Sequence, residues 1–180
     1  MLYINRGSYY LFWSVCAVRQ HCRTKGVARK CSSFLFSEGR RMKQVNIYVA
    51  STIKDLRKHD GKYIYLLEYE TKNGPATFHE IKEFKNRSKL GAEIGAVAAA
   101  LEHINKPCDI NIYVNTRQFE TYFRYYLPTW AKHKWRKTDG KLITWGKNWQ
   151  DIYKKASEHQ ILVHFKTHSY SNWLLKELGM

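Results

Sequence analysis

The sequence predicts an α/β domain in which helices flank a mixed five-stranded sheet. Three observations predict this fold class. Residues 43–84 contain three runs with the composition of strands. Residues 88–105 change to the period of an amphipathic helix, and strands and helices then alternate to the end of the chain. The 180 residues suffice for one domain with a real core, so we expect a single domain and an appendage.

The first three expected strands are rich in Val, Ile, Tyr and Phe. They are KQVNIYVAS at 43–51, KYIYLLEYET at 62–71 and PATFHEIKEF at 75–84. The dipeptide Asn73-Gly74 lies between the second and the third run. Because this dipeptide strongly favours a tight turn, we expect a hairpin there.

Residues 88–105 predict a helix with one buried face. Ser88 is the expected N-cap, and Pro107 lies just beyond the expected end. Apolar residues recur at intervals of three and four, which places them on one stripe of the helix. These residues are Leu90, Ile94, Val97, Leu101 and Ile104.

After this helix we expect strands and helices without a low-complexity segment. They are a strand at 108–116, short helices at 117–127 and 129–135, a helix at 148–158, a strand at 160–168 and a terminal helix at 171–178. The letters NIYV of the first strand recur in the strand at 108–116. One copy leads to Ala50 and the other to Asn115, so two buried strands end on small uncharged residues.

The chain is strongly basic. It has 31 Lys and Arg against 15 Asp and Glu, a formal net charge of +16. Such a charge favours a polyanionic partner, either nucleic acid or an anionic membrane surface. The alternative is a basic surface that is simply solvated. We expect nucleic acid as the partner and no membrane association.

Residues 1–41 differ from the rest in composition. Eight of them are Lys or Arg, and Glu38 is their single acid. Three interpretations stay open: a disordered basic extension, a leader that resembles a transit peptide, and translated upstream sequence. The third rests on EGRRMK at 38–43, which a purine-rich stretch resembling a ribosome-binding site can encode, with Met42 as the true start. The apolar run at 9–18 is too short to span a bilayer.

The cysteines predict neither a disulfide framework nor a metal site. They contain no CxxC pair, and the C-x5-C-x8-C spacing near His21 matches no standard zinc site. We expect free thiols in a reducing compartment, and therefore a cytoplasmic protein with no bound metal. The four residues are Cys16, Cys22, Cys31 and Cys108.

Glu93 is the most informative residue of the expected helix. At about 100° per residue it lies about 60° from Leu90 and about 20° from Ile104, at the edge of the apolar stripe. A buried carboxylate needs a metal, a cation or several hydrogen-bond donors as partners. The alternative is a glutamate at the helix margin whose carboxylate reaches solvent.

In order and spacing, several segments resemble a type 1 ribonuclease H domain. They are QVNIYVAST, AEIGAVAAALE, INIYVNT and VHFKTHS, and TWAKHKWRKTDGKLITWGKNW between the last two resembles the basic handle that grips hybrid duplexes in that family. The resemblance covers nearly all of residues 42–178. It implies the ribonuclease H fold for residues 42–180, and cleavage of the RNA strand of an RNA:DNA hybrid by two divalent ions held by four carboxylates.

Transfer of the family's four carboxylate positions finds one carboxylate in this chain. In chain order, the positions read Ala50, Glu93, Asn115 and Lys176. The last is counted from Asn172, and Glu177 is the alternative if the register shifts by one. Mg²⁺ requires oxygen ligands, above all anionic ones. The resemblance therefore implies an inactive site.

The resemblance also leaves remnants of the catalytic set. His168 corresponds to the histidine of the family's terminal loop, so Glu93 and His168 are the vestigial catalytic residues. Because Glu93 needs a compensating charge, we expect Lys176 or His168 to approach it.

The handle predicts a nucleic-acid-binding surface. Its basic side chains suit phosphate neutralisation and its tryptophans suit stacking, although Trp130 and Trp149 fit packing inside the handle better. In the family, two Asn residues read the minor groove, and their positions are occupied here by Lys89 and Leu90. We therefore do not expect the protein to distinguish RNA:DNA hybrids from other duplexes. The predicted contact residues are Lys132, Lys134, Trp135, Arg136, Lys137, Lys141, Lys89 and Arg117.

The sequence thus favours a monomeric ribonuclease H-like protein that binds RNA, DNA or hybrid without cutting it, and without a cofactor. One alternative is an active or weakly active Mg²⁺-dependent ribonuclease H, which uses Glu93, Asn115 and a further carboxylate. The other is a protein-interaction module that binds a partner protein in the cleft of the former active site. Metal-dependent cleavage of a hybrid distinguishes the enzyme from the other two, and nucleic-acid binding at low salt distinguishes the favoured interpretation from the interaction module.

Overall fold

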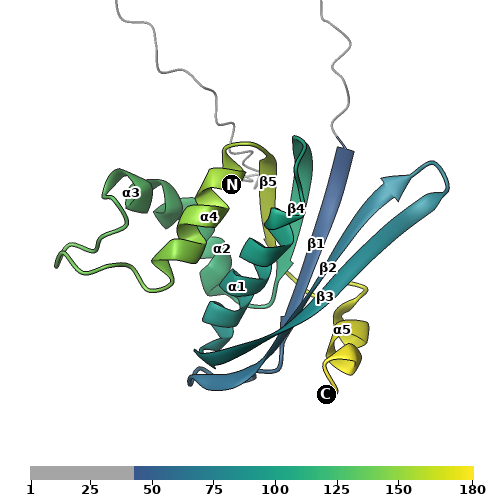
Figure 1. Ribbon diagram of the computed structural model, residues 1–180, viewed down its shortest axis with the longest axis horizontal. Coiled ribbons are helices and arrows are strands. Elements are labelled where there is room, and N and C mark those ends of the chain that lie inside the picture. Colours follow the sequence, from purple (N-terminus) through teal and green to yellow (C-terminus); the bar gives the residue numbers. More distant parts are fainter. Residues whose placement is uncertain (1–42) are drawn as a thin grey trace, which may run out of the picture.

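The computed structural model describes residues 43–180 (Figure 1). The expectations for residues 1–41, including those for Cys16, Cys22 and Cys31, lie outside the described residues. The elements are β1 (Lys43–Ser51), β2 (His59–Thr71), β3 (Gly74–Arg87), α1 (Lys89–Glu102), β4 (Cys108–Val114), α2 (Arg117–Thr121), the π-helical turn η1 (Tyr122–Tyr126), α3 (Leu127–Lys132), α4 (Gly146–Ala156), β5 (Gln160–Phe165) and α5 (Ser171–Glu177).

The five strands form one mixed sheet in the order β3-β2-β1-β4-β5. β1, β2 and β3 pair antiparallel, whereas β4 runs parallel to both β1 and β5. The predicted fold class, a mixed five-stranded sheet flanked by helices, is confirmed. Because β1, β4 and β5 are parallel, their C-terminal ends meet at one edge of the sheet, and the loops that follow them lie together there.

The two NIYV segments are neighbours in this sheet. Asn46 lies opposite Asn111 and Tyr48 opposite Tyr113. The Asn111 Nδ2 group donates to Asn46 Oδ1 at 3.0 Å, and the two tyrosine rings stack with centroids 4.8 Å apart. The repeat therefore gives matched side chains on paired strands, which fixes the register of β1 against β4.

The expected hairpin joins β2 and β3. Thr71 pairs with Gly74 across the turn, and Gly74 adopts a φ of +105°, a conformation that favours glycine. Both strands are longer than the sequence predicted, because β2 begins at His59 and β3 continues to Arg87.

Helices cover both faces of the sheet (Figure 1). α1 contacts β1, β2 and α4 on one face, and α5 contacts β1 from the other. Ser88 caps α1 as expected, since its hydroxyl accepts a hydrogen bond from the Gly91 N–H at 3.2 Å. The helix is buried on all sides from Gly91 to Leu101, not on one stripe alone. Its many Ala and Gly residues allow the sheet and α4 to pack closely on opposite sides.

The two short helices expected at 117–127 and 129–135 are joined. α2, η1 and α3 run without a break from Arg117 to Lys132. Pro128 lies in the first turn of α3 directly after the π turn. Proline lacks an N–H, and a widened turn before it removes the need for the missing hydrogen bond. The helix then ends at Lys132, three residues earlier than expected.

No helix within residues 43–180 combines the length and the apolar character that crossing a bilayer requires. Cys108, the one cysteine in the described range, is buried and carries a free thiol.

Candidate functional site

Glu93 lies inside the protein, next to the end of β4. Its exposed fraction is 1%. One carboxylate oxygen accepts a hydrogen bond from the Asn115 N–H at 3.2 Å, and the other accepts from the Thr116 hydroxyl. The segment that follows β4 thus supplies the donors that a buried carboxylate needs. The prediction that Glu93 is buried and partnered is confirmed.

The protein environment raises the pKa of Glu93 to about 7. Burial is the largest cause, because it disfavours the charged form. The hydrogen bond from Thr116, the charge of Lys89 and the backbone donors oppose the shift without cancelling it. Glu93 is therefore a carboxyl group that holds a proton over part of the neutral pH range.

The prediction that Lys176 or His168 approaches Glu93 is wrong. Within residues 43–180, Glu93 forms no ion pair, and its hydrogen bonds come from Asn115 and Thr116. Neutral donors suffice here because the raised pKa lowers the charge that must be compensated. Thr116 was missed by the sequence reasoning, since its role depends on how β4 meets α1.

Ala50 and Asn115 lie side by side at the edge where β1 and β4 end. The Asn115 Nδ2 group donates to the Val49 carbonyl at 3.0 Å, which ties the end of β4 to β1. Ala50 is 4% exposed and packs with Tyr48 on the face covered by α5. The sequence correctly placed both residues at one site.

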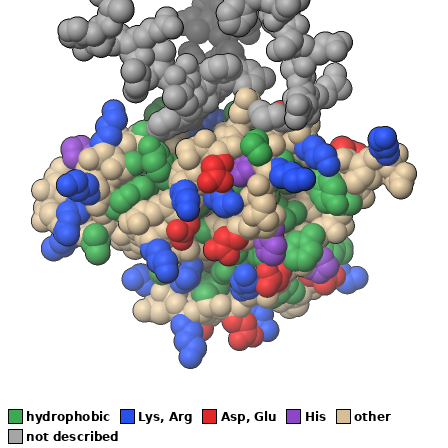
Figure 2. Space-filling model, turned by 45° about the horizontal axis from the view of Figure 1, so that its top comes forward, with side chains coloured by type: hydrophobic (Ala, Val, Ile, Leu, Met, Phe, Trp, Pro, Cys, Tyr) green, Lys and Arg blue, Asp and Glu red, His purple; other side chains and the backbone are tan. Residues whose placement is uncertain are grey.

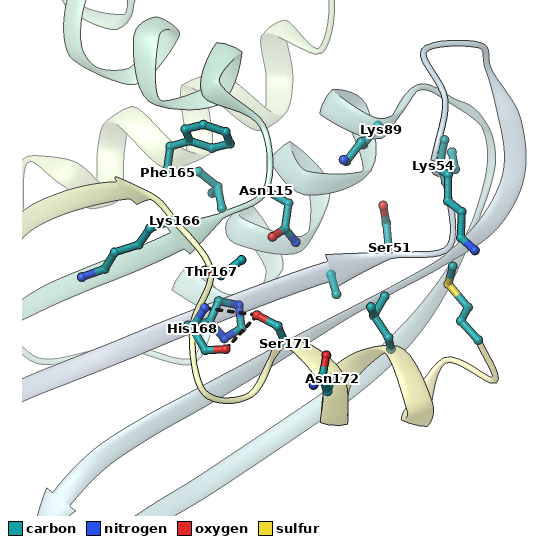
Figure 3. Close-up of a pocket in the computed structure, with 15 residues that line it drawn as sticks. Ser51, Lys54, Lys89, Asn115, Phe165, Lys166, Thr167, His168, Ser171 and Asn172 are labelled. Atoms are coloured by element: carbon teal, nitrogen blue, oxygen red, sulfur yellow. Dashed lines mark hydrogen bonds between the residues drawn. The ribbon is translucent and has the colours of Figure 1, made fainter.

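A cavity of about 770 Å³ lies at this edge (Figure 3). Its walls are the end of β1, the first residue of α1, Asn115, the loop after β5, and α5. Three of its lining residues are cationic, namely Lys54, Lys89 and Lys166. Its other polar lining residues are Ser51, Asn115, Thr167, His168, Ser171 and Asn172. No Asp or Glu of the described chain lines it.

α5 turns a different set of residues to the cavity from the one expected. Ser171, Asn172 and Leu175 line it, whereas Lys176 and Glu177 do not. Lys176 and Glu177 are both exposed. Counting along the family motif from Asn172 had assigned Lys176 to this site, but Leu175 lines the cavity in its place.

His168 belongs to an aromatic cluster and has no contact with Glu93. Its ring packs against Tyr48 and Tyr113, with centroids 4.7 and 5.9 Å away. Its backbone N–H donates to Ser171 Oγ at 3.1 Å (Figure 3). Burial lowers the pKa of His168, and neither ring nitrogen has a hydrogen-bond partner in the described part of the chain.

These residues do not fit a pair of divalent ions. Nowhere in residues 43–180 do three or more His, Cys, Asp or Glu side chains gather as a metal site. The single carboxylate, Glu93, is bonded to Asn115 and Thr116. The side chains that do face the cavity include three lysines, which repel a cation.

The handle lies beside the other helices, at the left of Figure 1, as α3, the loop after it and the start of α4. A bridge between Arg136 and Leu142 closes the loop. Its cationic side chains are all exposed, and Asp139 is the single acid between residues 130 and 149. Lys and Arg side chains gather at this side of the molecule in Figure 2. The exposed cations are Lys132, Lys134, Arg136, Lys137, Lys141 and Lys147.

The handle tryptophans pack inside the domain. Trp149 is 1% exposed, and Trp130 meets it at 5.6 Å between ring centroids. Trp135 is half-buried and packs edge-on against Tyr153 at 5.7 Å. Trp135, which the sequence assigned to nucleic acid, thus also holds the loop against α4.

Trp145 connects the handle to α1. Its indole lies against Gly91, where an added Cβ would come within 2.6 Å of the ring. The Arg87 guanidinium stacks on the same indole at 4.9 Å. Arg117, the remaining predicted contact, is exposed at the start of α2, two residues after Asn115.

Comparison with known sequences gives relatives that are named ribonuclease H. No family model matches the chain. It is 28% identical over 102 residues to the ribonuclease H of Rickettsia bellii, a match that covers 57% of this chain and 63% of that protein, which is less than two thirds of its length. It is 26% identical over 127 residues to the ribonuclease H of Legionella pneumophila strain Corby, which covers 70% of this chain and 85% of that protein.

Comparison with solved structures agrees on the fold. LC9-RNase H1, described as a type 1 RNase H with the type 2 active-site motif, matches with a TM-score of 0.61 and 15% identity over 77% of this chain and 73% of that one. The PFV RNase H domain in solution matches with a TM-score of 0.51 and 16% identity over 78% of this chain and 93% of that one. The sheet order, the flanking helices and these similarities show that residues 43–180 have a ribonuclease H-like fold.

Proposed function

We propose that this domain binds nucleic acid as a monomer in the cytoplasm and does not hydrolyse it. The observation that carries the proposal is the cavity at the ends of β1 and β4, which three lysines line and which no described carboxylate enters. Metal-assisted hydrolysis needs anionic ligands at this edge, whereas binding of a polyanion gains from cations there.

The exposed cations of the handle support binding. Five lysines and an arginine project from a loop and two helix ends that hold one acidic residue, so the local field attracts phosphate. A solved relative gives a precedent: the foamy viral protease-reverse transcriptase was determined with an RNA/DNA hybrid, and it matches with a TM-score of 0.53 and 15% identity over 88% of this chain and 22% of that one.

The hydrogen bonds of the Glu93 carboxyl, which bind both of its oxygens to the segment after β4, support the proposed absence of hydrolysis. The pKa of Glu93 is also raised to about 7. A protonated or inward-bonded carboxyl is a poor ligand for a hard cation. Asn115 offers at most a neutral carbonyl, and Ala50 offers nothing.

The first turn of α1 supports duplex binding without selection for hybrid. Lys89 and Leu90 occupy the positions that read the minor groove in the resembled family. A lysine neutralises any phosphate, and a leucine has no side-chain hydrogen-bonding group. We therefore expect similar affinities for RNA/DNA hybrid, double-stranded RNA and double-stranded DNA.

The handle is tested by measuring binding of fluorescent duplexes by anisotropy. Replacing Lys134, Arg136 and Lys137 together by Ala should weaken binding and flatten its salt dependence. The slope of log affinity against log salt should fall by up to about 0.9 for each phosphate that the handle no longer neutralises. The matched control removes three exposed lysines that lie outside the handle and the cavity, and should bind nearly as the unaltered protein does. These are Lys72, Lys85 and Lys106.

Equal affinities and salt slopes for the two triple variants would show that the handle is not the binding surface. Absence of binding by the unaltered protein, even at low salt, would contradict the proposed function and favour the protein-interaction module. The competing function, hydrolysis of the RNA strand, is favoured by the names of the relatives. It predicts cleavage of a hybrid that depends on Mg²⁺ or Mn²⁺.

A further inference from the structure

We propose that the cavity at the ends of β1 and β4 is a phosphate-binding site, which holds one backbone phosphodiester of the bound nucleic acid by lysine side chains. This inference rests on the proposed function, because it names the group that the same site takes. It goes further because it assigns a phosphate contact to the cavity in addition to those of the handle.

The charge of the cavity favours an anion. Lys54, Lys89 and Lys166 line it, and none of them forms an ion pair with a described residue. Lys54 and Lys166 are exposed and Lys89 is half-buried. Three cations that form no ion pair line one space, and although the charge of Lys89 also acts on buried Glu93, together they favour a positive potential there. Long lysine side chains can adjust to a phosphate as point charges.

Lys89 gives this region a fixed centre. It is the first residue of α1, a helix of 14 residues. In Figure 3, its side chain projects toward Asn115 from one side, while Lys54 and Lys166 stand at opposite sides of the view. The N-terminus of a helix carries partial positive charge that favours phosphate. The Lys166 ammonium lies over the Tyr113 ring at 5.3 Å, so its side chain must rotate to contact an anion in the cavity.

The neutral side chains of the cavity complete the site. Ser51 and Thr167 carry hydroxyls that bond to no described residue. The Asn115 side-chain amide donates one hydrogen to the Val49 carbonyl, and its second hydrogen is available to a ligand. Phosphate oxygens accept hydrogen bonds from such groups. The volume of about 770 Å³ exceeds that of one phosphate, so it leaves room for the adjoining sugars.

The cavity adjoins the handle through the first turn of α1. Trp145 of the handle packs on Gly91, two residues after Lys89. Arg87 stacks on Trp145 and donates to the Gly91 carbonyl at 3.3 Å, which holds this junction together. A strand bound along the handle therefore meets Lys89 and the cavity next, and a phosphodiester within that strand is the ligand that the geometry favours.

The test uses the full chain and a fluorescent RNA/DNA hybrid, with binding measured by anisotropy across a salt series. The triple variant Lys54→Ala, Lys89→Ala, Lys166→Ala should bind at least about tenfold more weakly. Its salt slope should fall by about 0.9, the value expected when one phosphate is no longer neutralised. The control triple variant of Lys72, Lys85 and Lys106, which removes the same charge elsewhere, should change both quantities far less. Lys89→Arg should retain affinity, and thermal melting should confirm that each variant is folded.

A neutral backbone linkage tests for a single phosphate. Hybrids that carry one methylphosphonate, moved along the backbone, should lose affinity for the unaltered protein at a particular position. The cavity variant should lose nothing further at that position, because its partner for that phosphate is already gone. Hybrids with 5′-hydroxyl and 5′-phosphate ends should bind the unaltered protein equally.

The outcomes separate this inference from the proposed function. Normal binding by the cavity variant, with binding weakened in the handle variant, would overturn the phosphate site and leave the proposed function standing. Loss of binding only for hybrids with 5′-hydroxyl ends would replace the phosphodiester by a terminal phosphate. If the unaltered protein binds no nucleic acid, both proposals are wrong.

Discussion

The carboxyl group of Glu93 faces the segment after β4, where the Asn115 N–H and the Thr116 hydroxyl bind its two oxygens. Burial raises its pKa to about 7. The ionised carboxyl accepts these hydrogen bonds more strongly, but burial disfavours its charge by more, so the folded protein favours the protonated form at the junction of α1 and β4. We therefore expect the stability of the fold to depend on the protonation of Glu93.

The first prediction concerns the pH dependence of folding. The pKa of Glu93 rises from an ordinary 4.5 to about 7 on folding, so between these values the folded state holds a proton that the unfolded state has released. The free energy of unfolding should thus fall as pH rises through this window. Glu93→Gln mimics the protonated form and lacks this dependence. From pH 5 to pH 8, it should gain roughly 2 to 3 kcal/mol relative to the unaltered protein.

Urea unfolding at pH 5, 6, 7 and 8 measures this difference. The matched control is Glu102→Gln, which removes an exposed carboxylate at the far end of the same helix. Its stability should run parallel to that of the unaltered protein. Parallel curves for Glu93→Gln would mean that Glu93 titrates alike in the folded and unfolded states.

At the scale of residues, the sequence predicted where side chains lie in the fold better than it predicted which groups they contact. The burial of Glu93 followed from its place on the helix, and the meeting of Ala50 and Asn115 from the twin strands. Thr116 as donor was not predictable, because it depends on the approach of two elements that are far apart in sequence. Lys54 and Lys166 were missed for the same reason, since isolated lysines in loops carry no local signal.

The elements meet at the first turn of α1, where the helix, the sheet and the handle join. The sequence predicted α1 and its cap from local patterns alone. It did not predict that the helix is buried on every side or that residues 117–132 form one run with a π turn, because both features come from packing. α5 likewise lines the cavity with Leu175 and not with Lys176, which depends on how the helix packs on the sheet.

The second prediction tests this junction through two glycines. In Gly91→Ala, the new Cβ would lie 2.6 Å from the Trp145 indole, on which the Arg87 guanidinium stacks. The indole must shift, and the variant should lose about 1 to 3 kcal/mol of stability. Gly146→Ala is the matched control, since nothing lies within 4 Å of its added Cβ. It should be neutral or stabilising by about 0.4 to 1 kcal/mol.

Thermal melting compares the two glycine variants, and Trp fluorescence reports on the indole. Equal melting temperatures would show that Trp145 does not rest firmly on α1. The handle would then be free of the helix, and a continuous path from handle to cavity would lose its support.

At the scale of the whole molecule, exposed cations lie on the handle and lysines line the cavity, and the net charge of +16 is consistent with a polyanionic partner. The sequence predicted this partner class and the sheet that displays the site. It left open whether residues 1–41 contribute to the fold.

The third prediction concerns those residues. If the domain is complete from Met42, a chain that begins there should keep the melting temperature of the full chain, because the first 41 residues then add nothing to the core. In a domain of this size, 1 kcal/mol shifts the midpoint by about 3 °C. A drop of more than a few degrees in differential scanning calorimetry would make the leader part of the fold.

The central claim is that the domain binds nucleic acid without cutting it, and incubation of a labelled RNA/DNA hybrid with Mg²⁺ or Mn²⁺ tests it most directly. Under conditions in which anisotropy shows the hybrid to be bound, the unaltered protein should leave the RNA strand intact. Metal-dependent cleavage that Glu93→Gln abolishes, while hybrid binding persists, would contradict the claim. That result would mean that a single visible carboxylate assembles a working metal centre at the ends of β1 and β4.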